Sequence, residues 1–550
     1  MGRRCKIFLA LFFWISAWHA FLLANQHVAT QLSKHLIHHE YYLPQGPWSI
    51  HVLQVQLQPD QVLIETVKAK EQLLGREKTS LLARKMMRKG YSLLAGVNGD
   101  YFSPEGIPSG CQVVRGNIIK NPRTNWSVFA ITRHLSPFIS TVWLNGWVRT
   151  KKGQFFHLSG INARRGEDEL VLYNSYKGIS THSNIYGTEA ILQPINSFQV
   201  GDTTLFLVEN VFSQAGNTTI ASEHFILSGH GRAERFLKSN IATGDTLRLF
   251  VSLPPIQEAI YSLVGGTPRI VRDGEVSVES KREGLSDSFA RSRHPRTAVG
   301  FSRDKKTLYL LTVDGRQPQY SVGMSLFELA DFMVSIGAWQ ALNLDGGGST
   351  TMVIRDSIVN SPSEATGERP VANALFAIET PKADAPFSFE IIPSVAWLAS
   401  NSDFTFQVLA PTDSGQQARQ NLSWSCDPQL GHIRDGRLFV NGKNKSGYVY
   451  VQWNGKKDSA RVHTLPATKV VVLPPKRTVK VGQTIRLRAV AFADNNIKLS
   501  NTSFRWSASN RLGVILPDGR FNAMQRGATE IRASLANAWG TGTLTVEFSE

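Results

Sequence analysis

The chain contains few cysteines, and this limits how its fold can be stabilised. Only three are present, and Cys5 lies at the very start of the sequence. The other two, Cys111 and Cys426, are too far apart to form a disulfide framework, and no CxxC or Cys/His cluster provides a structural zinc site. We therefore expect the 550-residue chain to be stabilised by burial of several hydrophobic cores rather than by cross-links.

Long blocks of positive charge are also missing, although the net charge is +17. The lysines and arginines are scattered along the chain, which disfavours a nucleic-acid-binding module, so no nucleic-acid partner is expected. An excess of this size still attracts anionic partners. The composition leaves open a lipid surface, a wall polymer or a phosphorylated sugar.

The N-terminus has the layout of an export signal. A short basic segment precedes the apolar run "IFLALFFWISAWHAFLLA", and cleavage after Ala24 would fit a signal peptide over residues 1–24. The alternative is an uncleaved membrane anchor, because the run is nearly long enough to span a bilayer. Both interpretations predict an extracytoplasmic protein that is secreted, periplasmic or envelope-associated.

A repeat near the C-terminus predicts two similar domains. "WSCDPQLG" from Trp424 is followed by "DGRLFV", and "WSASNRLG" from Trp506 is followed by "DGRFNA". Alternating strand-like segments and Asp-Gly turns surround both copies. These features predict two all-β Ig-like sandwiches over residues 381–466 and 467–550, and the second resembles bacterial Ig-like modules.

The region 25–380 mixes many strand-like segments with few helical ones. Helical patterns occur at "TSLLARKMMRKG", which should stop at Gly90, and at "SLFELADFMVSIG", which should stop at Gly337. Glu328 follows Ser325 by three residues, so we interpret it as part of a capping box and not as a catalytic group. The predicted fold is an α+β domain with a mixed β-sheet.

Five polar clusters in this region each follow an apolar strand-like run, where side chains are firmly held and can face a common cleft. The clusters are "NGDYF", "GGTPRIVRDG", "HPRTAVGF", "VDGRQPQYSVG" and "NLDGGGST". Three carboxylates, Asp100, Asp314 and Asp345, are candidates for acid, base or nucleophile. His294 is a further candidate proton carrier. Two arginines, Arg296 and Arg316, present forks suited to phosphate or carboxylate.

The run of three glycines is difficult to explain as an ordinary turn, because a hairpin needs at most two. It lacks the lysine and following helix of a Walker loop. Gly346, Gly347 and Gly348 are instead predicted to expose successive N–H groups as an anion nest, with the Ser349 and Thr350 hydroxyls as further donors.

Taken in order, "NGDYF", "GGTPRIVRDG", "HPRTAVGFS", "TVDGRQPQYSVGMSLFELADFM", "ALNLDGGGSTTM" and "RPVANAL" resemble the phosphodiester glycosidase family. The resemblance spans residues 98–378 and is weak between 126 and 253. It implies hydrolysis of the bond between a sugar's anomeric carbon and a phosphodiester oxygen, with an envelope or exopolysaccharide role. The implied partners are a phosphodiester-linked sugar or anionic glycan and the cell envelope, and no cofactor is expected, although a divalent metal stays open.

For that reaction we assign Arg296, Arg316 and the 346–350 loop to the phosphate. Asp345 is the first choice for the carboxylate that serves the sugar, followed by Asp100 and Asp314, while their individual roles stay open. The other expected substrate-binding residues carry amide or hydroxyl groups; they are Asn98, Thr297, Ser321, Asn343 and Asn373.

Two other functions stay open from the sequence. One is an envelope phosphodiesterase that cuts a P–O bond, for which metal ligands such as Asp and His would be expected. The other is a non-catalytic surface protein that binds anionic glycans.

Overall fold

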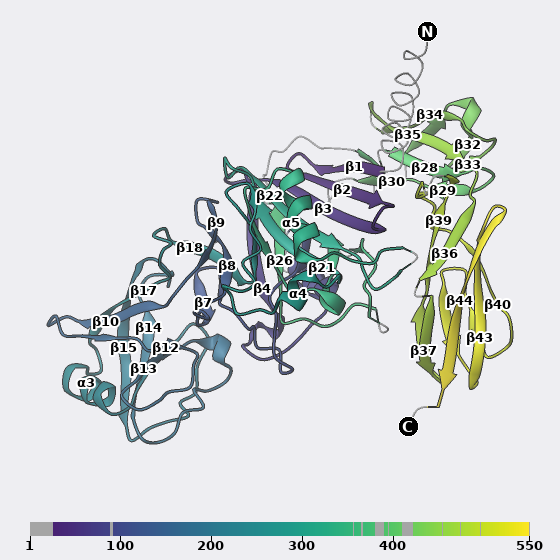
Figure 1. Ribbon diagram of the computed structural model, residues 1–550. Coiled ribbons are helices and arrows are strands. Elements are labelled where there is room, and N and C mark those ends of the chain that lie inside the picture. Colours follow the sequence, from purple (N-terminus) through teal and green to yellow (C-terminus); the bar gives the residue numbers. More distant parts are fainter. Residues whose placement is uncertain are drawn as a thin grey trace, which may run out of the picture.

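The computed structural model describes residues 26–548, apart from 89–91, 319, 356, 365–366, 380–389, 394, 410–421, 454, 474 and 495–496. The predicted leader and the stop at Gly90 thus lie outside the described residues. Three parts are visible in Figure 1: a β unit at one end, a central region, and two sandwiches at the other end. No helix in the described part is long and apolar enough to cross a membrane.

The central region is built on an eight-stranded antiparallel sheet that also includes the first described strands of the chain. In spatial order its strands are β1 (Gln26–Ser33), β2 (Leu36–Leu43), β3 (Trp48–Gln56), β22 (Thr307–Val313), β21 (Arg296–Phe301), β23 (Gln340–Asn343), β19 (Arg269–Arg272) and β20 (Glu275–Val276). One face is covered by α4 (Asp287–Arg291) and α5 (Leu326–Ser335).

Two five-stranded sheets complete the central region. The first contains β25 (Ser357–Ile358), β24 (Met352–Ile354), β5 (Ser92–Asn98), β26 (Asn373–Glu379) and β4 (Val62–Lys68), and α2 (Thr79–Arg88) packs against it. The second contains β7 (Asn117–Lys120), β6 (Gln112–Val114), β18 (Ile260–Gly265), β8 (Ser127–Thr132) and β9 (Pro137–Thr141). A shared core joins all three sheets through buried residues such as Leu310, Val97 and Phe129.

The segment without family motifs forms a second eight-stranded sheet, whose core is shared with the five-stranded sheet that contains β6, β8 and β18. Its strands are β11 (Phe155–His157), β10 (Asn145–Thr150), β17 (Thr246–Ser252), β15 (Thr203–Ser213), β14 (Thr188–Pro194), β16 (Phe225–Gly229), β13 (Leu170–Tyr173) and β12 (Gly160–Ile161), with α3 (Arg232–Asn240) packed on it. Its β12–β13 pair is parallel and its other pairs are antiparallel, so this is the mixed sheet. The α+β prediction is confirmed, with strands far outnumbering helices.

The capping prediction for α5 is also confirmed. Ser325 accepts a hydrogen bond from the backbone N–H of Glu328, and the Glu328 carboxylate accepts one from the N–H of Ser325. Gly337 adopts a φ of +97° just after this helix, a left-handed conformation that costs little at glycine. Glu328 therefore serves the helix terminus and not the chemistry.

The C-terminal region consists of two Ig-like sandwiches with matching strand orders. In the first sandwich, a four-stranded sheet faces a three-stranded sheet. The four-stranded sheet contains β28 (Val395–Ala399), β35 (Lys456–Leu465), β34 (Ser446–Trp453) and β31 (Ser423–Cys426). The three-stranded sheet contains β29 (Asp403–Thr405), β33 (Arg437–Val440) and β32 (Gly431–Arg434), and β27 (Glu390–Ile392) and β30 (Gln407–Leu409) form a further pair. In the second sandwich, the four-stranded sheet contains β37 (Lys476–Lys480), β44 (Ala538–Glu547), β43 (Gly527–Leu535) and β40 (Arg505–Ala508). The three-stranded sheet that faces it contains β38 (Thr484–Arg486), β42 (Arg520–Ala523) and β41 (Gly513–Ile515), and β36 (Lys469–Leu473) and β39 (Arg488–Phe492) form the further pair.

The repeated Trp and Asp-Gly motifs have the same structural role in both sandwiches. A Cβ built on Gly436 would lie 3.1 Å from the Trp424 ring, and one on Gly519 would lie 3.2 Å from the Trp506 ring. Both glycines have φ near +80° and lie over the edge of their tryptophan. The sequence repeat is thus a repeat of one core contact.

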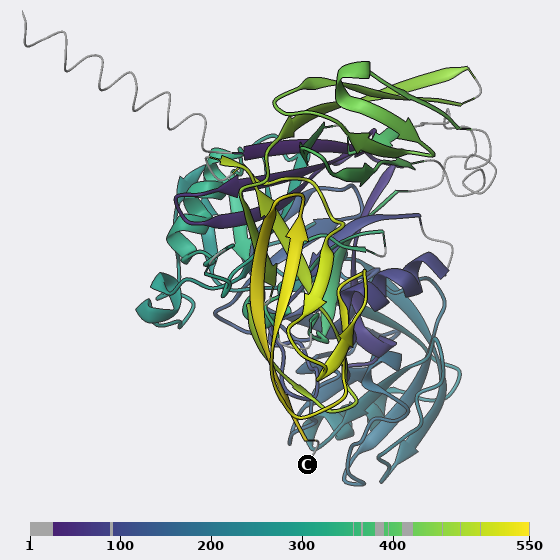
Figure 2. The ribbon, with the colours of Figure 1, turned by 90° about the vertical axis from the view of Figure 1, so that its right-hand side faces the viewer.

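The second sandwich packs against the central region, and it lies in front of that region in the view of Figure 2. Tyr42 and Tyr320 form one buried apolar cluster with Leu473 and Phe492. A salt bridge of 3.5 Å joins Lys498 Nζ to Glu40. The sandwich is therefore an integral neighbour of the region that carries the family motifs, and not a separate module on a linker.

Candidate active site

The motif-bearing loops meet where strands from two sheets end. β5 ends at Asn98 and β23 ends at Asn343, while β21 begins at Arg296 and β26 begins at Asn373. Arg296 pairs with Val313 at the end of β22, because antiparallel neighbours bring opposite termini together. Segments distant in the sequence thus contribute side chains to one cluster.

Asp100 follows β5 and is almost completely buried. Its Oδ2 accepts a 2.6 Å hydrogen bond from the N–H of Gly110, whereas its Oδ1 has no partner among the described residues. Burial raises the pKa of Asp100 to about 7; the negative charge of Asp345 adds to this effect, and Lys120 opposes it. Asp100 is thus a carboxyl group able to hold or release a proton near neutral pH.

Asp345 follows β23 and is partly exposed. Burial raises its pKa to about 6, and the Ser349 hydroxyl and the charge of Arg369 moderate this rise. Asp345 therefore loses its proton at lower pH than Asp100. The structure brings these two predicted catalytic residues together, with separate proton affinities.

The three glycines fit tightly among neighbouring groups. Gly347 has a φ of +60°, and a Cβ there would lie 3.2 Å from the Arg316 guanidinium. A Cβ on Gly348 would lie 2.0 Å from a carboxylate oxygen of Glu364 and 2.5 Å from Arg369. Glycine is required at 347 by the positive φ, and at 346 because a Cβ there would lie 2.6 Å from the backbone oxygen of Pro295.

Several backbone donors of this turn are engaged within the protein, and the anion nest stays a prediction. The N–H of Gly347 donates to the Pro295 carbonyl, that of Ser349 to Gly346, and that of Thr350 to Gly347. Residues 347–349 form a short 3₁₀ helix, which uses these donors internally. The glycines also create space for Arg316 and for the ion pair between Arg369 and Glu364.

Asn98 connects the two aspartate-bearing loops and does not face solvent. Its Nδ2 donates to the Asp345 carbonyl at 2.7 Å, and its Oδ1 accepts from the Thr297 hydroxyl at 2.8 Å and from the Thr351 N–H at 3.0 Å. The Thr297 hydroxyl also lies 3.4 Å from that of Thr350. These bonds give the buried groups a positioning role, while direct substrate contact by Asn98, Thr297 and Thr350 stays a prediction.

Asn373 and Ser321 are also buried and bonded within the protein. The Asn373 Oδ1 accepts the N–H of Asp100 at 2.8 Å, and its Nδ2 donates to Gln112 at 3.0 Å. The Ser321 hydroxyl donates to the Asp314 carbonyl at 2.5 Å. Both residues hold loops in place, and their roles as substrate ligands stay predictions.

Asn343 retains one free polar atom at the site. Its Nδ2 donates to the Tyr101 hydroxyl at 2.8 Å and to the Thr267 carbonyl at 2.7 Å. Its Oδ1 is buried and unpaired among the described residues. Burial, with the nearby charge of Asp345, raises the pKa of Tyr101, so this phenol stays a neutral donor. Tyr101 and Asn343 together offer polar contacts beside Asp345.

Arg296 is a buried cation whose fork is already engaged. Its Nε donates to the Met324 carbonyl at 2.9 Å, and its Nη2 donates to the carbonyls of Ser292 at 2.8 Å and Phe289 at 3.2 Å. Burial lowers its pKa to about 10, yet it stays charged at neutral pH. Arg296 therefore caps α4 and adds positive charge, but two of its nitrogens cannot grip phosphate as predicted.

His294 and Arg316 lie beside this cation. Burial and the charges of Arg296 and Arg316 lower the pKa of His294, so the imidazole is neutral at physiological pH. Its backbone forms a bridge with Met324. Arg316 is exposed and borders the triple-glycine turn, which leaves it accessible to an anionic ligand.

Asp314 belongs to the structural support of the site. Its Oδ1 accepts from the Asn360 side chain at 3.0 Å and from the Ser361 N–H at 2.8 Å, and Asn360 also donates to the Thr350 carbonyl. Burial raises the pKa of Asp314 to about 6, against the effects of these bonds and of Arg488 and Lys498. These bonds anchor the segment behind the glycine turn, while its Oδ2 is buried without a partner among the described residues, so the catalytic role of Asp314 stays a prediction.

Two residues with direct bearing on the carboxylate pair were not assigned from the sequence. Arg369 lies in "RPVANAL" and Tyr101 in "NGDYF", so both motifs were visible, but no spacing rule linked them to Asp345. Their roles depend on contacts between loops that are distant in the sequence.

A possible metal site lies apart from these carboxylates. His38, Glu40 and His51 have ligand atoms within 4.8 Å of one another, and they are the one such group among the described residues. Lys498 already supplies a positive charge to Glu40, and His38 hydrogen-bonds His51 at 3.2 Å. These three side chains are therefore better explained as part of the interface with the second sandwich than as ligands of a metal ion.

Comparison with known proteins agrees with these motifs. Residues 203–378 match the model of the phosphodiester glycosidase family. This part of the chain is similar to that family. The similarity extends to N-acetylglucosamine-1-phosphodiester alpha-N-acetylglucosaminidase of Bos taurus, at 34% identity over 117 residues, and of Homo sapiens, at 32% over 117 residues.

These matches cover 20% of this chain and 22% of each relative, so the chain spans about a fifth of the length of the curated relatives it matches. A hypothetical protein from Synechocystis shares the fold, with a TM-score of 0.50 and 19% identity over 64% of both chains. The similarity to the family thus rests on the sequence matches, and the structural likeness concerns the fold alone.

Proposed function

We propose that the protein hydrolyses a sugar-1-phosphodiester at the bond between the anomeric carbon and the phosphodiester oxygen. The observation that supports this most strongly is the pairing of Asp100 and Asp345, whose pKa values are raised to about 7 and about 6. Two carboxyl groups with separate proton affinities are the requirement for acid–base or nucleophilic chemistry at a glycosidic carbon.

In this proposal Asp345 acts as the carboxylate and Asp100 holds the proton. Asp345 is the more acidic and is partly exposed, so it can stabilise positive charge developing on the sugar ring or attack it. Asp100 transfers a proton to or from water. The phosphomonoester leaves as a stable anion, and the charges of Arg316 and Arg369 stabilise its developing charge.

We also propose an extracytoplasmic location and a substrate in envelope or exopolysaccharide metabolism. The basic segment followed by an apolar run, and the two Ig-like sandwiches, support this location. The family supports a phosphodiester-linked sugar, while the identity of that sugar is a matter for a substrate panel.

The experiment is a panel of sugar-1-phosphodiesters with chromogenic and nucleotide aglycones, assayed with the parent protein and the variants Asp345→Asn and Asp100→Asn. We expect each variant to lose roughly a hundredfold or more in kcat/KM, with an unchanged circular dichroism spectrum. Asp331→Asn, which removes an exposed carboxylate from α5, is the matched control and should keep full activity. Equal turnover by all three variants would contradict the proposal.

A further inference from the structure

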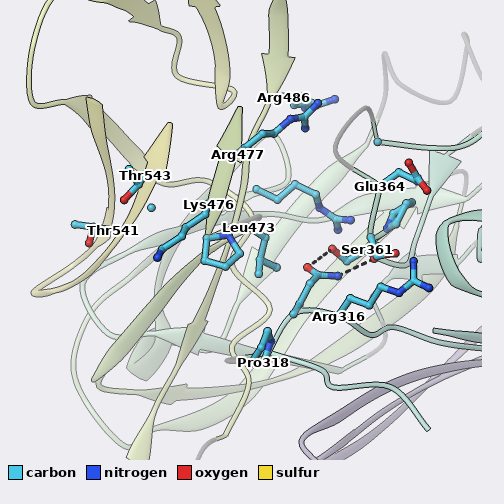
Figure 3. A pocket seen from close by; sticks show the side chains of 17 residues that line it. Arg316, Pro318, Ser361, Glu364, Leu473, Lys476, Arg477, Arg486, Thr541 and Thr543 are labelled. Carbon is cyan, nitrogen blue, oxygen red and sulfur yellow. Dashed lines mark hydrogen bonds between the residues drawn. The ribbon is translucent and has the colours of Figure 1, made fainter. Parts of the chain in front are cut away.

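A cleft of about 640 Å³ lies between the central region and the second sandwich (Figure 3). One wall is formed by Arg316 and the segment 361–364, and the other by strands of the sandwich that carry Lys476, Arg477 and Arg486. Its volume falls within the range of ordinary ligand sites. The cleft exists only because the sandwich packs against the region that carries the family motifs.

The cleft is strongly cationic. Five basic side chains line it against one carboxylate, Glu364; the basic residues are Arg316, Lys476, Arg477, Arg486 and Arg488. The described salt bridges of the second sandwich join Lys498 to Glu40 and Arg520 to Asp518, and so use none of the lining cations. Several positive charges in a concave site raise the local concentration of an anionic ligand.

Both walls also carry polar atoms that lack partners. Arg477 Nε and Ser363 Oγ are buried and have no hydrogen-bond partner among the described residues. Both atoms are closed to solvent, so a ligand in the cleft would meet the exposed parts of these two side chains and not these atoms. Arg488 is different, because its Nη1 donates to the Asn360 carbonyl at 2.6 Å and holds the two walls together.

The cleft is continuous with the active site through two residues. Arg316 lies against Gly347, and Glu364 lies against Gly348 while forming an ion pair with Arg369. Both glycines belong to the turn that follows Asp345. A ligand with its scissile phosphate near Asp345 could therefore extend past Arg316 into the cleft.

We propose that this cleft is an aglycone subsite that selects substrates whose leaving group carries at least one further phosphate, as in a phosphate-linked polyol or glycan chain. This inference rests on the proposed function for its reaction and deepens it by naming the substrate class. Phosphate matches the fork geometry of Arg477 and Arg486. The second sandwich then has a role in substrate selection and is more than a spacer.

The test compares two synthetic substrates that differ in one phosphate: a sugar-1-phosphoglycerol and the same compound with a phosphate on the terminal glycerol hydroxyl. The variant Arg477→Gln/Arg486→Gln should lower kcat/KM for the extended substrate roughly tenfold, about threefold for each arginine, because Arg477 is partly exposed and Arg486 is exposed. The value for the short substrate should change less than twofold. The control Lys480→Gln/Arg505→Gln removes the same charge from exposed positions of the same sandwich outside the cleft, and should leave both values unchanged.

Direct binding separates this inference from the proposed reaction. A linear glycerol-phosphate oligomer is titrated calorimetrically into the parent protein, the cleft variant and the control. It should bind the parent more tightly than the cleft variant, and it should bind the parent and the control equally tightly. If the oligomer binds in this order while neither substrate is turned over, the subsite is supported and the proposed reaction is contradicted. Equal binding to all three proteins, an equal loss on both substrates, or equally tight binding of a single-stranded DNA of the same charge would overturn the subsite.

Discussion

Replacement of Asn98 by alanine tests how the two aspartate loops are held together. Asn98 is fully buried and makes three hydrogen bonds that span β5, β21 and the segment after the glycine turn. Asn98→Ala removes these bonds and leaves the Thr351 N–H and the Asp345 carbonyl buried without this partner. Since an orphaned buried group costs roughly 1–3 kcal/mol, we expect the central region to lose about 3 kcal/mol of unfolding free energy.

The assay is denaturant unfolding followed by circular dichroism, with hydrogen exchange of the Thr351 amide as a local readout. Asn145→Ala is the matched control, because that side chain is exposed and makes one long hydrogen bond of 3.4 Å. The control should change stability by less than about 0.5 kcal/mol. A stable Asn98→Ala variant with a raised KM alone would refute the positioning role and support Asn98 as a direct sugar ligand.

Three further perturbations address the charges of the site and of the interface. The pH profile of kcat/KM should be bell-shaped, rising as Asp345 ionises near pH 6 and falling as Asp100 ionises near pH 7, and a profile flat from pH 5 to 9 would exclude this assignment. The folded-state pKa of Asp100, about 7, lies above its ordinary value of 3.8, so the parent loses stability as pH rises from 4 to 7. Asp100→Asn should therefore be more stable than the parent by roughly 4 kcal/mol at pH 8 and nearly equal to it at pH 4, as measured by denaturant midpoints. Arg369→Met should move the acid limb of the rate profile to higher pH, because Arg369 lowers the pKa of Asp345. Arg369→Lys keeps the positive charge, so its acid limb should lie close to that of the parent.

Much of the architecture was predictable because it depends on local patterns. The capping box at Ser325 and the paired tryptophans at 424 and 506 are short-range motifs, and both have the predicted structures. The convergence of the motif-bearing loops was also predictable from polar residues placed at strand ends.

The roles of individual side chains were less predictable, because they depend on partners distant in the sequence. Asn98 was predicted to bind substrate, yet its side chain donates to the backbone carbonyl of Asp345. Asn360, for which no role was predicted from the sequence, donates to the Thr350 carbonyl. Arg296 is engaged by carbonyls around α4, which no pattern in "HPRTAVGF" reveals. The cleft was not predicted for the same reason, since it arises from the packing of the second sandwich.

Hydrolysis in ¹⁸O-labelled water tests the central claim most directly. The parent protein is incubated with a sugar-1-phosphodiester that it turns over, and both products are analysed by mass spectrometry. Attack at the anomeric carbon, served by Asp100 and Asp345, places the label in the sugar and none in the phosphomonoester. Label in the phosphate would show P–O cleavage and contradict this account.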